Sequence, residues 1–400
     1  MAALKIGLVV PGYQADAADW CIPALTNLVR ALAARPDIAL HVFTLRYPPR
    51  RAVYRLHGAT IHAFGGAPFG SRRIRGASLA RLWAEAAAAI RAEHRRAPFA
   101  VLHGFWATES GWVAAATGRA LGIPTLVHLA GGELTWDAAV RYGNRRPGLA
   151  RLLVAGSLRL ATHITVPSTP LARQLRRHYP TLARKAVPWA FGVDRARFAP
   201  PPVPADPPTP SALRLVHAAS LVPVKDQMLL LDGLAAARAA APEISFTLTI
   251  AGAGPLRTAL AARAARADLA GAVRFAGEVR HDALPALYHT HDVFVLTSRH
   301  EAQCLAVLEA AACGLPWIGP PVGALADLAG EAPPSGWCVA PADPATLAAA
   351  LRAAAAPGER ARRGVAALAA VARDYDLLTQ TERLIGLYRE AGAASRRANW

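Results

Sequence analysis

The hydrophobic positions of the chain fall into short runs that alternate with longer stretches of helical periodicity. The apolar runs predict strands at 39–44, 99–103, 125–129, 162–166, 245–251, 272–276, 292–296 and 316–319. The amphipathic stretches predict helices at 78–96, 109–121, 149–160, 255–268, 282–290 and 303–313. Short continuous apolar strands separated by helices are typical of parallel sheets that are covered on both faces.

The alternation occurs in two halves that start in the same way. The first half opens with the strand pattern LKIGLVV and the helix pattern IPALTNLVRALAA, and the second with LRLVHAA and QMLLLDGLAAARAA. Between them, residues 199–211 contain seven prolines in thirteen positions, which excludes a helix or a central strand and predicts an extended linker. We therefore expect domains at 1–198 and 212–375, followed by a C-terminal helix at 376–400 that returns to the first domain.

The predicted fold class is α/β, with two Rossmann-like, doubly wound domains that face each other across a cleft. Ligands of this fold class bind at the carboxyl ends of the parallel strands. The loops that follow the strands are therefore the place to look for functional side chains.

Composition agrees with two folded domains but leaves the meaning of the charge open. The chain has 400 residues, 53% of them hydrophobic, and a net charge of +18. Only Lys5, Lys185 and Lys225 are lysines among 45 basic residues, so arginine carries nearly all the positive charge. This pattern indicates either a compositional bias or a basic surface for anionic lipids or polyanions. A nucleic-acid-binding protein is an alternative that rests on charge alone.

The cysteines and the N-terminus predict a cytoplasmic protein. Cys21, Cys304, Cys313 and Cys338 form no CxxC pair, which favours buried thiols over a disulfide framework. The first apolar run is too short for a signal-peptide core, and no run reaches the ~18–20 residues of a membrane span.

The segment 294–316, FVLTSRHEAQCLAVLEAAACGLP, places two acids around the start of a predicted helix. Glu301 lies in the loop at the carboxyl end of a strand, and Glu309 lies eight residues later on the helix. A lone acid in an Ala/Leu-rich helix is costly to bury unless it is paired, and a sugar diol offers a carboxylate two O–H donors. The alternative is an exposed helix face.

Two further features of the second half follow predicted strands. Lys225 is a candidate phosphate ligand, because a fixed cation stabilises the charge that a leaving nucleoside diphosphate gains; the alternative is a solvated surface lysine. Gly252 and Gly254 in AGAGPLR form an incomplete dinucleotide fingerprint, and a purely structural turn is the alternative.

The pattern E-x7-E closed by EAAACGLP resembles the donor-site signature of retaining GT-B glycosyltransferases, in particular family four. FAVLHGFWATESGWVA, LGIPTLVHLAGGEL, ATHITVPSTPLARQL and FGVDRARF are similar to the family's N-terminal half. AASLVPVKDQMLLLDGL, LTIAGAGPLR, VRFAGEVRHDALPALYHTHDVFVLTSRHE and SGWCVAPADPATLAAAL are similar to its C-terminal half. The resemblance spans roughly residues 4–390.

The resemblance implies a role for each candidate residue of the second half. Glu309 would bind the nucleotide ribose, Lys225 the phosphates, and Glu301 the donor sugar. The remaining implied donor contacts are the backbone groups of Gln303, Cys304 and Leu305, the base contacts at Val279 and Arg280, and the turn at Gly252 and Gly254. The sequence departs from the family at Ala302–Cys304, where Gly-Phe-Gly is usual, and at Ser220, which replaces an arginine; Arg299, Arg280 or the helix dipole would have to compensate.

In the first half, the resemblance draws attention to three polar side chains and one glycine. Ala130 stands where a histidine often contacts the donor sugar, and His128 lies two residues earlier on the same strand face. Glu133 is a candidate for sugar or acceptor contacts. His103 resembles a family position, although a packed core histidine is the preferred interpretation. Gly12 would allow close approach of the acceptor or the phosphates, or would be an ordinary turn glycine.

The sequence therefore predicts an enzyme that transfers a sugar from a nucleotide-diphosphate donor to a glycan, lipid-linked or small-molecule acceptor. The resemblance implies retention of configuration and neither a metal nor a cofactor, and no D-x-D motif is placed to bind a metal. Peripheral contact with an anionic membrane at its inner face is compatible with the basic charge, and nucleic acid is not an expected partner. A sugar-nucleotide epimerase of the same fold and a non-catalytic sugar-nucleotide binder stay as alternatives.

Overall fold

A computed structural model describes residues 3–66, 76–201 and 211–398. It divides into an N-terminal unit, comprising Met1–Pro167, Leu171–Gly192 and Leu377–Trp400, and a C-terminal unit, comprising Ser168–Pro170 and Val193–Asp376. Residues 193–198, which the sequence assigned to the first domain, are thus grouped with the second. Most of the predicted linker, residues 202–210, lies outside the described residues.

The N-terminal unit is built on one eight-stranded sheet in the order β3-β4-β2-β1-β5-β6-β7-β8. Its strands are β1 (Leu4–Gly12), β2 (Ile38–Tyr47), β3 (Arg51–Leu56), β4 (Ala59–Phe64), β5 (Val101–Phe105), β6 (Thr125–His128), β7 (His163–Val166) and β8 (Ala186–Pro188). All neighbouring strands are parallel except β3, which pairs antiparallel with β4. The sheet is therefore parallel, as predicted, except at this edge.

The antiparallel edge follows from a tight turn. His57 and Gly58 join β3 to β4 with φ values of 51° and 81°, the left-handed pair that a two-residue hairpin needs. β3 reads RAVYRL and has no buried residue, as expected of an edge strand that faces water. Its arginines explain why no apolar run marks this strand in the sequence.

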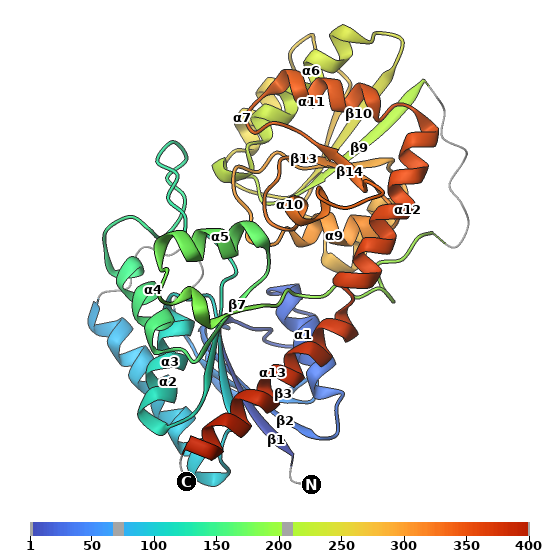
Figure 1. Cartoon of the computed structure of the whole chain (residues 1–400). Helices are drawn as coiled ribbons and strands as arrows, with labels where there is room; N and C mark the ends of the chain where they lie inside the picture. The colour runs from blue at the N-terminus through green and yellow to red at the C-terminus, as the bar shows by residue number, and fades with distance from the viewer. Residues whose placement is uncertain (1–2, 67–75, 202–210, 399–400) are drawn as a thin grey trace. The chain divides into compact units, whose positions relative to one another are not determined.

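The helices of the N-terminal unit form two groups. They are α1 (Pro23–Ala33), α2 (Gly76–Arg96), α3 (Glu109–Leu121), α4 (Leu149–Leu160), α5 (Thr169–His178) and α13 (Leu377–Ala398). α3 packs against α2 and α4, whereas α13 packs against α1 and β5. Figure 1 shows the strands between these two groups. The C-terminal helix thus completes the N-terminal unit.

The C-terminal unit has an all-parallel sheet in the order β11-β10-β9-β12-β13-β14. Its strands are β9 (Ala212–Ala218), β10 (Ser245–Ala251), β11 (Val273–Gly277), β12 (Val293–Val295), β13 (Trp317–Gly319) and β14 (Gly336–Cys338). Its helices are α6 (Gln227–Ala240), α7 (Arg257–Ala264), α8 (Leu284–His289), α9 (Leu305–Ala312), α10 (Ala324–Leu328), α11 (Pro344–Ala353) and α12 (Pro357–Asp374). A core of Leu, Ile, Val and Phe side chains lies between β9, β10, β12 and the helices α6 and α11.

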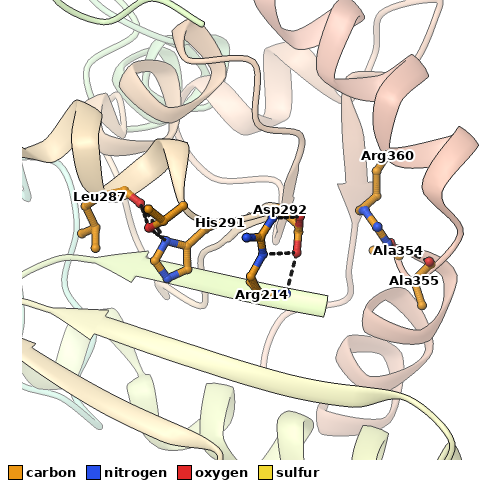
Figure 2. Close-up of polar contacts among 8 residues, drawn as sticks. Arg214, Leu287, His291, Asp292, Ala354, Ala355 and Arg360 are labelled. Carbon is orange, nitrogen blue, oxygen red and sulfur yellow. Dashed lines mark hydrogen bonds and ion pairs between the residues drawn. The ribbon is translucent and has the colours of Figure 1, made fainter. Parts of the chain in front are cut away.

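The amino ends of β9 and β12 are joined by polar contacts (Figure 2). The guanidinium of Arg214 donates to both oxygens of Asp292, at 2.9 and 3.1 Å, and the backbone N–H of Arg214 donates to Asp292 Oδ2 at 2.8 Å. Arg360 on α12 is buried and donates through Nη1 to the carbonyls of Ala354 and Ala355 at 2.8 and 2.7 Å, where α11 has ended. These contacts stabilise the edge opposite to the carboxyl ends of the strands.

Within the described residues, no helix combines the length and the apolar composition that crossing a membrane would require.

Candidate functional site

The predicted site residues of the C-terminal unit lie in loops that follow neighbouring strands. Lys225 ends a short 3-10 helix (Pro223–Lys225) after β9, and Glu301 follows β12. Gly252 follows β10, and Arg280 follows β11. Because β11, β10, β9 and β12 are consecutive in a parallel sheet, these loops share its carboxyl edge, where such sheets bind ligands.

Lys225 and Glu301 form an ion pair. Lys225 Nζ lies 2.5 Å from Glu301 Oε1, and the hydroxyl of Ser298 donates to the same oxygen at 2.6 Å. The side chains are 23% and 11% exposed. One oxygen of the Glu301 carboxylate is therefore shared by a cation and a hydroxyl, contacts of the charge-assisted kind.

The two loops that carry this pair are joined by one side-chain and one backbone hydrogen bond. Thr297 Oγ1 donates to the carbonyl of Lys225 at 3.1 Å, and the N–H of Arg299 donates to the carbonyl of Val224 at 2.8 Å. Arg299 also lies 3.4 Å from the carboxylate of Asp226. Lys225 is therefore held at the sheet edge and is not the solvated lysine of the alternative interpretation.

A series of buried hydrogen bonds connects β12, β9 and the start of α6 to the loop after β9. His217 on β9 and Gln227 at the start of α6 are fully buried. Burial lowers the pKa of His217 to about 4, so its ring is neutral near pH 7. The neutral ring donates from Nδ1 to the carbonyl of Val295 at 2.8 Å and accepts from Gln227 Nε2 at 3.3 Å, and the same amide donates to the carbonyl of Ser220 at 3.0 Å.

Glu309 is buried on α9 and has a histidine partner. Its Oε1 lies 2.7 Å from Nε2 of His281, which follows β11. The other ring nitrogen of His281, Nδ1, lies 3.4 Å from the guanidinium of Arg197. The ring of His281 also packs against that of Phe198, with 5.1 Å between the ring centroids. The exposed helix face offered as the alternative for Glu309 is wrong, and the acid is paired as a buried carboxylate requires.

The departure at Ala302–Cys304 preserves a glycine-like backbone. Cys304 has φ 79° and ψ 58°, the left-handed conformation that glycine adopts most easily, and its side chain is buried. Gly323 approaches this loop so closely that a Cβ on it would lie 2.9 Å from the carbonyl oxygen of Gln303. α9 begins at Leu305, and the first N–H groups of a helix have no partners within the helix.

Gly252 and Gly254 form the tight turn that the sequence suggests. Their φ values are 139° and 156°, and added Cβ atoms would lie 2.0 Å from the carbonyl oxygen of Ala219 and 2.4 Å from that of Leu221. The glycines thus let the loops after β9 and β10 touch backbone to backbone. This packing accounts for both glycines without a ligand.

The two arginines considered as replacements for the missing cation at Ser220 are engaged with acids. Arg280 is exposed and lies 3.2 Å from Asp282, and Arg299 contacts Asp226. Val279 is half-buried beside Arg280. In the described parts of the chain, no group of three or more His, Cys, Asp and Glu side chains is arranged to hold a metal ion.

In the N-terminal unit, His103 and His128 lie in an aromatic cluster at the centre of the sheet. Both are fully buried, and burial lowers both pKa values, that of His128 to about 3. His103 contacts Tyr388 of α13 at 2.8 Å, which fits a packed core histidine. His128 Nδ1 contacts Thr165 at 3.0 Å, and its buried Nε2 has no hydrogen-bond partner among the described residues.

Glu133 is folded back onto the backbone. Its carboxylate accepts N–H groups from Ala107, Ala130 and Gly131, at 3.3, 3.1 and 2.7 Å, and is fully buried. Burial raises its pKa, while these hydrogen bonds act in the opposite direction. Both oxygens are used, so the geometry favours a role in holding the loops after β5 and β6 over a direct contact with sugar or acceptor.

Two further positions differ from what the sequence indicates. Gly12 does not follow the first strand but is the last residue of β1, pairs with Tyr47 and lies at a register shift. His281 was not among the candidates, because it lies 28 residues from Glu309 and no spacing in the sequence links them. Ser298 was missed for the opposite reason, since a serine next to an arginine in a loop is too common to stand out.

Two family models match the chain. Residues 24–197 match the model described as Glycosyltransferase Family 4, and residues 212–356 match the model described as Glycosyl transferases group 1. The first match falls mainly in the N-terminal unit and the second in the C-terminal unit, and together they cover most of the chain.

Individual proteins agree with these models. Glycogen synthase of Mycobacterium tuberculosis is 36% identical over 153 residues, which is 38% of this chain and only 36% of that protein's length. Sucrose-phosphate synthase from Thermosynechococcus elongatus superimposes with a TM-score of 0.73 at 20% identity, over 98% of this chain and 99% of that chain. Anabaena HepE in complex with UDP and glucose gives 0.72 at 18% identity, over 97% and 100%.

The structural likenesses confirm the predicted fold class of two Rossmann-like domains. At these identities they show the fold alone, and the predicted cleft stays a prediction. The family models carry the assignment further, because they match both halves of the chain in the expected order. The chain belongs to the group 1 glycosyltransferases of the family-four type, with the GT-B fold.

Proposed function

We propose that this protein transfers a sugar from a nucleotide-diphosphate donor to a hydroxyl acceptor, with retention of configuration and without a metal ion. The Lys225–Glu301 pair, at the sheet edge from which α9 starts, carries this proposal. It sets a cation and a helix N-terminus on loops of one edge, and both attract a diphosphate. Family membership supports the reaction class.

Each side chain has a distinct task in this proposal. Lys225 neutralises the charge that develops on the departing nucleoside diphosphate, and the N-terminus of α9 shares that charge. Glu309 accepts hydroxyls of the nucleotide ribose with the oxygen that His281 leaves open. Glu301 positions Lys225 and faces the donor sugar.

Retention requires that the new bond form on the face from which the diphosphate leaves. The acceptor oxygen bonds to the anomeric carbon as the bond from that carbon to the phosphate oxygen breaks. The acceptor proton passes to the leaving phosphate oxygen, so no protein base is needed.

The donor and acceptor classes are drawn from similar proteins. HepE was crystallised with UDP and glucose, and glycogen synthase is named for a glucan product. We propose a nucleotide-activated hexose as donor and a glycan or lipid-linked sugar as acceptor.

A binding screen followed by a product assay tests the proposal. The protein is heated with UDP-, GDP-, ADP- and TDP-sugars in EDTA; at 100 times Kd a ligand adds about 2.7 kcal/mol, or roughly 5–10 °C in Tm. The best donor is then incubated alone and with glycan acceptors, and NMR reads the anomeric configuration of the product. Conversion of the free donor without acceptor would indicate an epimerase, and a lack of any thermal shift in all four donors would refute the proposed site.

A further inference from the structure

Positive charge is concentrated in one part of the N-terminal unit. Between Glu133 and Asp194 the sequence has a single acid, Asp137, against ten arginines and lysines. This stretch of sixty residues carries a net charge of +9, which is half of the chain's +18. A compositional bias would spread arginine evenly and would not remove the acids from one stretch, so the charge here needs a local explanation.

Large apolar side chains are exposed in the same stretch. Trp136, Leu149 and Leu152 are 39%, 52% and 70% exposed, and they make up three of the seven large hydrophobic residues that are exposed in the described structure. Leu149 and Leu152 are three apart on the first turn of α4 and therefore share a face. Arg151 lies between them and is exposed as well.

A hairpin connects these residues to a basic helix. Residues 132–147 fold back on themselves through the bridge between Asp137 and Tyr142, and Figure 1 shows this segment projecting from the sheet of its unit. Thr135 donates to Gln174 of α5 at 3.0 Å, and Arg145 contacts the ring of His178 at 2.7 Å. The contacts hold the hairpin against α5.

Exposed arginines occur in the same segments as the exposed apolar side chains. Arg146 lies over the ring of Trp136, with 5.9 Å between the guanidinium carbon and the ring centroid. The other exposed arginines of the hairpin, the start of α4 and α5 are Arg141, Arg151, Arg173, Arg176 and Arg177. We call the hairpin with the first turn of α4 and the exposed face of α5 the basic-apolar surface.

The combination of exposed arginines and exposed apolar side chains distinguishes between a soluble polyanion and an anionic bilayer as the partner. A soluble polyanion is bound by charge and gains nothing from leucines that stand out into water. An anionic bilayer matches both components, because arginines pair with lipid phosphates while tryptophan and leucine enter the headgroup and acyl boundary.

We propose that the basic-apolar surface docks the protein on the surface of an anionic membrane. The docking is peripheral, and it is independent of the donor site in the C-terminal unit. It would bring the N-terminal unit to substrates that are held in the lipid.

Vesicle sedimentation tests the proposal with the full chain. We expect binding to vesicles of phosphatidylcholine with 30% phosphatidylglycerol, weak or no binding to phosphatidylcholine alone, and loss of binding as salt rises. The Leu149→Ser/Leu152→Ser and Arg141→Ser/Arg146→Ser/Arg151→Ser variants should each lose at least tenfold in vesicle affinity, since each surface arginine contributes a factor of about five.

Matched controls come from the C-terminal unit. Val365→Ser removes a side chain that is 70% exposed, and Arg266→Ser/Arg274→Ser/Arg352→Ser removes three exposed arginines. Both should bind vesicles like the unchanged protein, and all variants should keep the Tm and the nucleotide-sugar binding of the unchanged protein. Equal losses in controls and test variants would overturn the assignment to this surface. Failure of the unchanged protein to bind anionic vesicles, or binding to heparin that persists in Leu149→Ser/Leu152→Ser while vesicle binding is absent, would overturn membrane docking.

Discussion

The contact between Lys225 and Glu301 leads to a prediction in which one substitution strengthens ligand binding. In the free protein the ammonium group of Lys225 is paired with the carboxylate of Glu301, with 2.5 Å between Nζ and Oε1. A diphosphate must share Lys225 with this carboxylate, which lies close enough to repel it. Glu301→Gln should therefore bind the nucleoside diphosphate more tightly while losing sugar transfer. Lys225→Met should bind it more weakly.

The size of the effect follows from the spacing. A phosphate on the far side of Lys225 would lie about 5 Å from the carboxylate, where one pair of unit charges interacts by about 0.8–1.7 kcal/mol at dielectric constants of about 80 to 40. Removing the repulsion should tighten binding about 4- to 18-fold. Lys225→Met removes a charge-assisted hydrogen bond of about 1.5–3 kcal/mol, which corresponds to about 10- to 150-fold weaker binding.

Isothermal titration at low and high salt measures these changes, with the diphosphate of the donor that gives the largest thermal shift. The gain in Glu301→Gln should shrink at 0.5 M salt, because screening weakens charge repulsion in a partly exposed site. Asp232→Asn is the matched control, since Asp232 also pairs with a basic residue, Arg263, at 2.8 Å in the same unit. Weaker or unchanged diphosphate binding in Glu301→Gln at low salt would show that Lys225 does not contact the phosphates.

Three further predictions concern the surroundings of this pair. Cys304→Val should lower the free energy of unfolding in urea by about 2 kcal/mol, because a β-branched residue fits a φ of 79° poorly. Cys304→Gly should change it by no more than about 1 kcal/mol. Equal effects of the two substitutions would show that the backbone at this position is not strained. His281→Phe should weaken nucleotide-sugar binding about tenfold without changing the preference among donor sugars, since it leaves Glu309 without its partner at 2.7 Å. Titration calorimetry measures the affinity. An unchanged affinity would exclude a role for His281 in positioning Glu309. The pKa of His217 is lowered to about 4, so the unfolded chain takes up a proton first as the pH falls below 6.5, and stability is lost down to about pH 4. That loss should reach about 2 kcal/mol between pH 7.5 and 5, and urea titrations of His217→Asn should show a smaller pH dependence; an identical slope would refute it.

The sequence predicts the interior of both sheets well because buried parallel strands are continuous apolar runs. The prediction for 245–251 agrees with β10, and α6 begins and ends where the pattern QMLLLDGLAAARAA does. The edges are less predictable, although the edge strand β11 was predicted at 272–276. β3 and β14 lack a continuous apolar run, since their residues are only partly buried.

The charged residues of the candidate site were predictable from the sequence, whereas the residues that hydrogen-bond to them were not. Lys225 and Glu301 stood out because each charge follows a buried strand, and the parallel sheet brings such positions together. His281 and Ser298 could not be found this way, because their partners depend on how the loops fold. Glu133 was found for its chemistry, but its three backbone partners became apparent only in the folded chain.

The departures from the family pattern have different physical consequences. At Cys304 the backbone has the left-handed conformation that glycine adopts without strain, so a cysteine at this position costs about 1–2 kcal/mol in strain. At Ser220 the loss is one of charge, and Arg280 and Arg299 both lie beside carboxylates. A diphosphate in this site would therefore depend on Lys225 and the helix N-terminus more than in a relative with a second cation. For this reason Lys225→Met should weaken diphosphate binding toward the upper end of its expected range, and Ser220→Arg should restore part of what Lys225→Met removes.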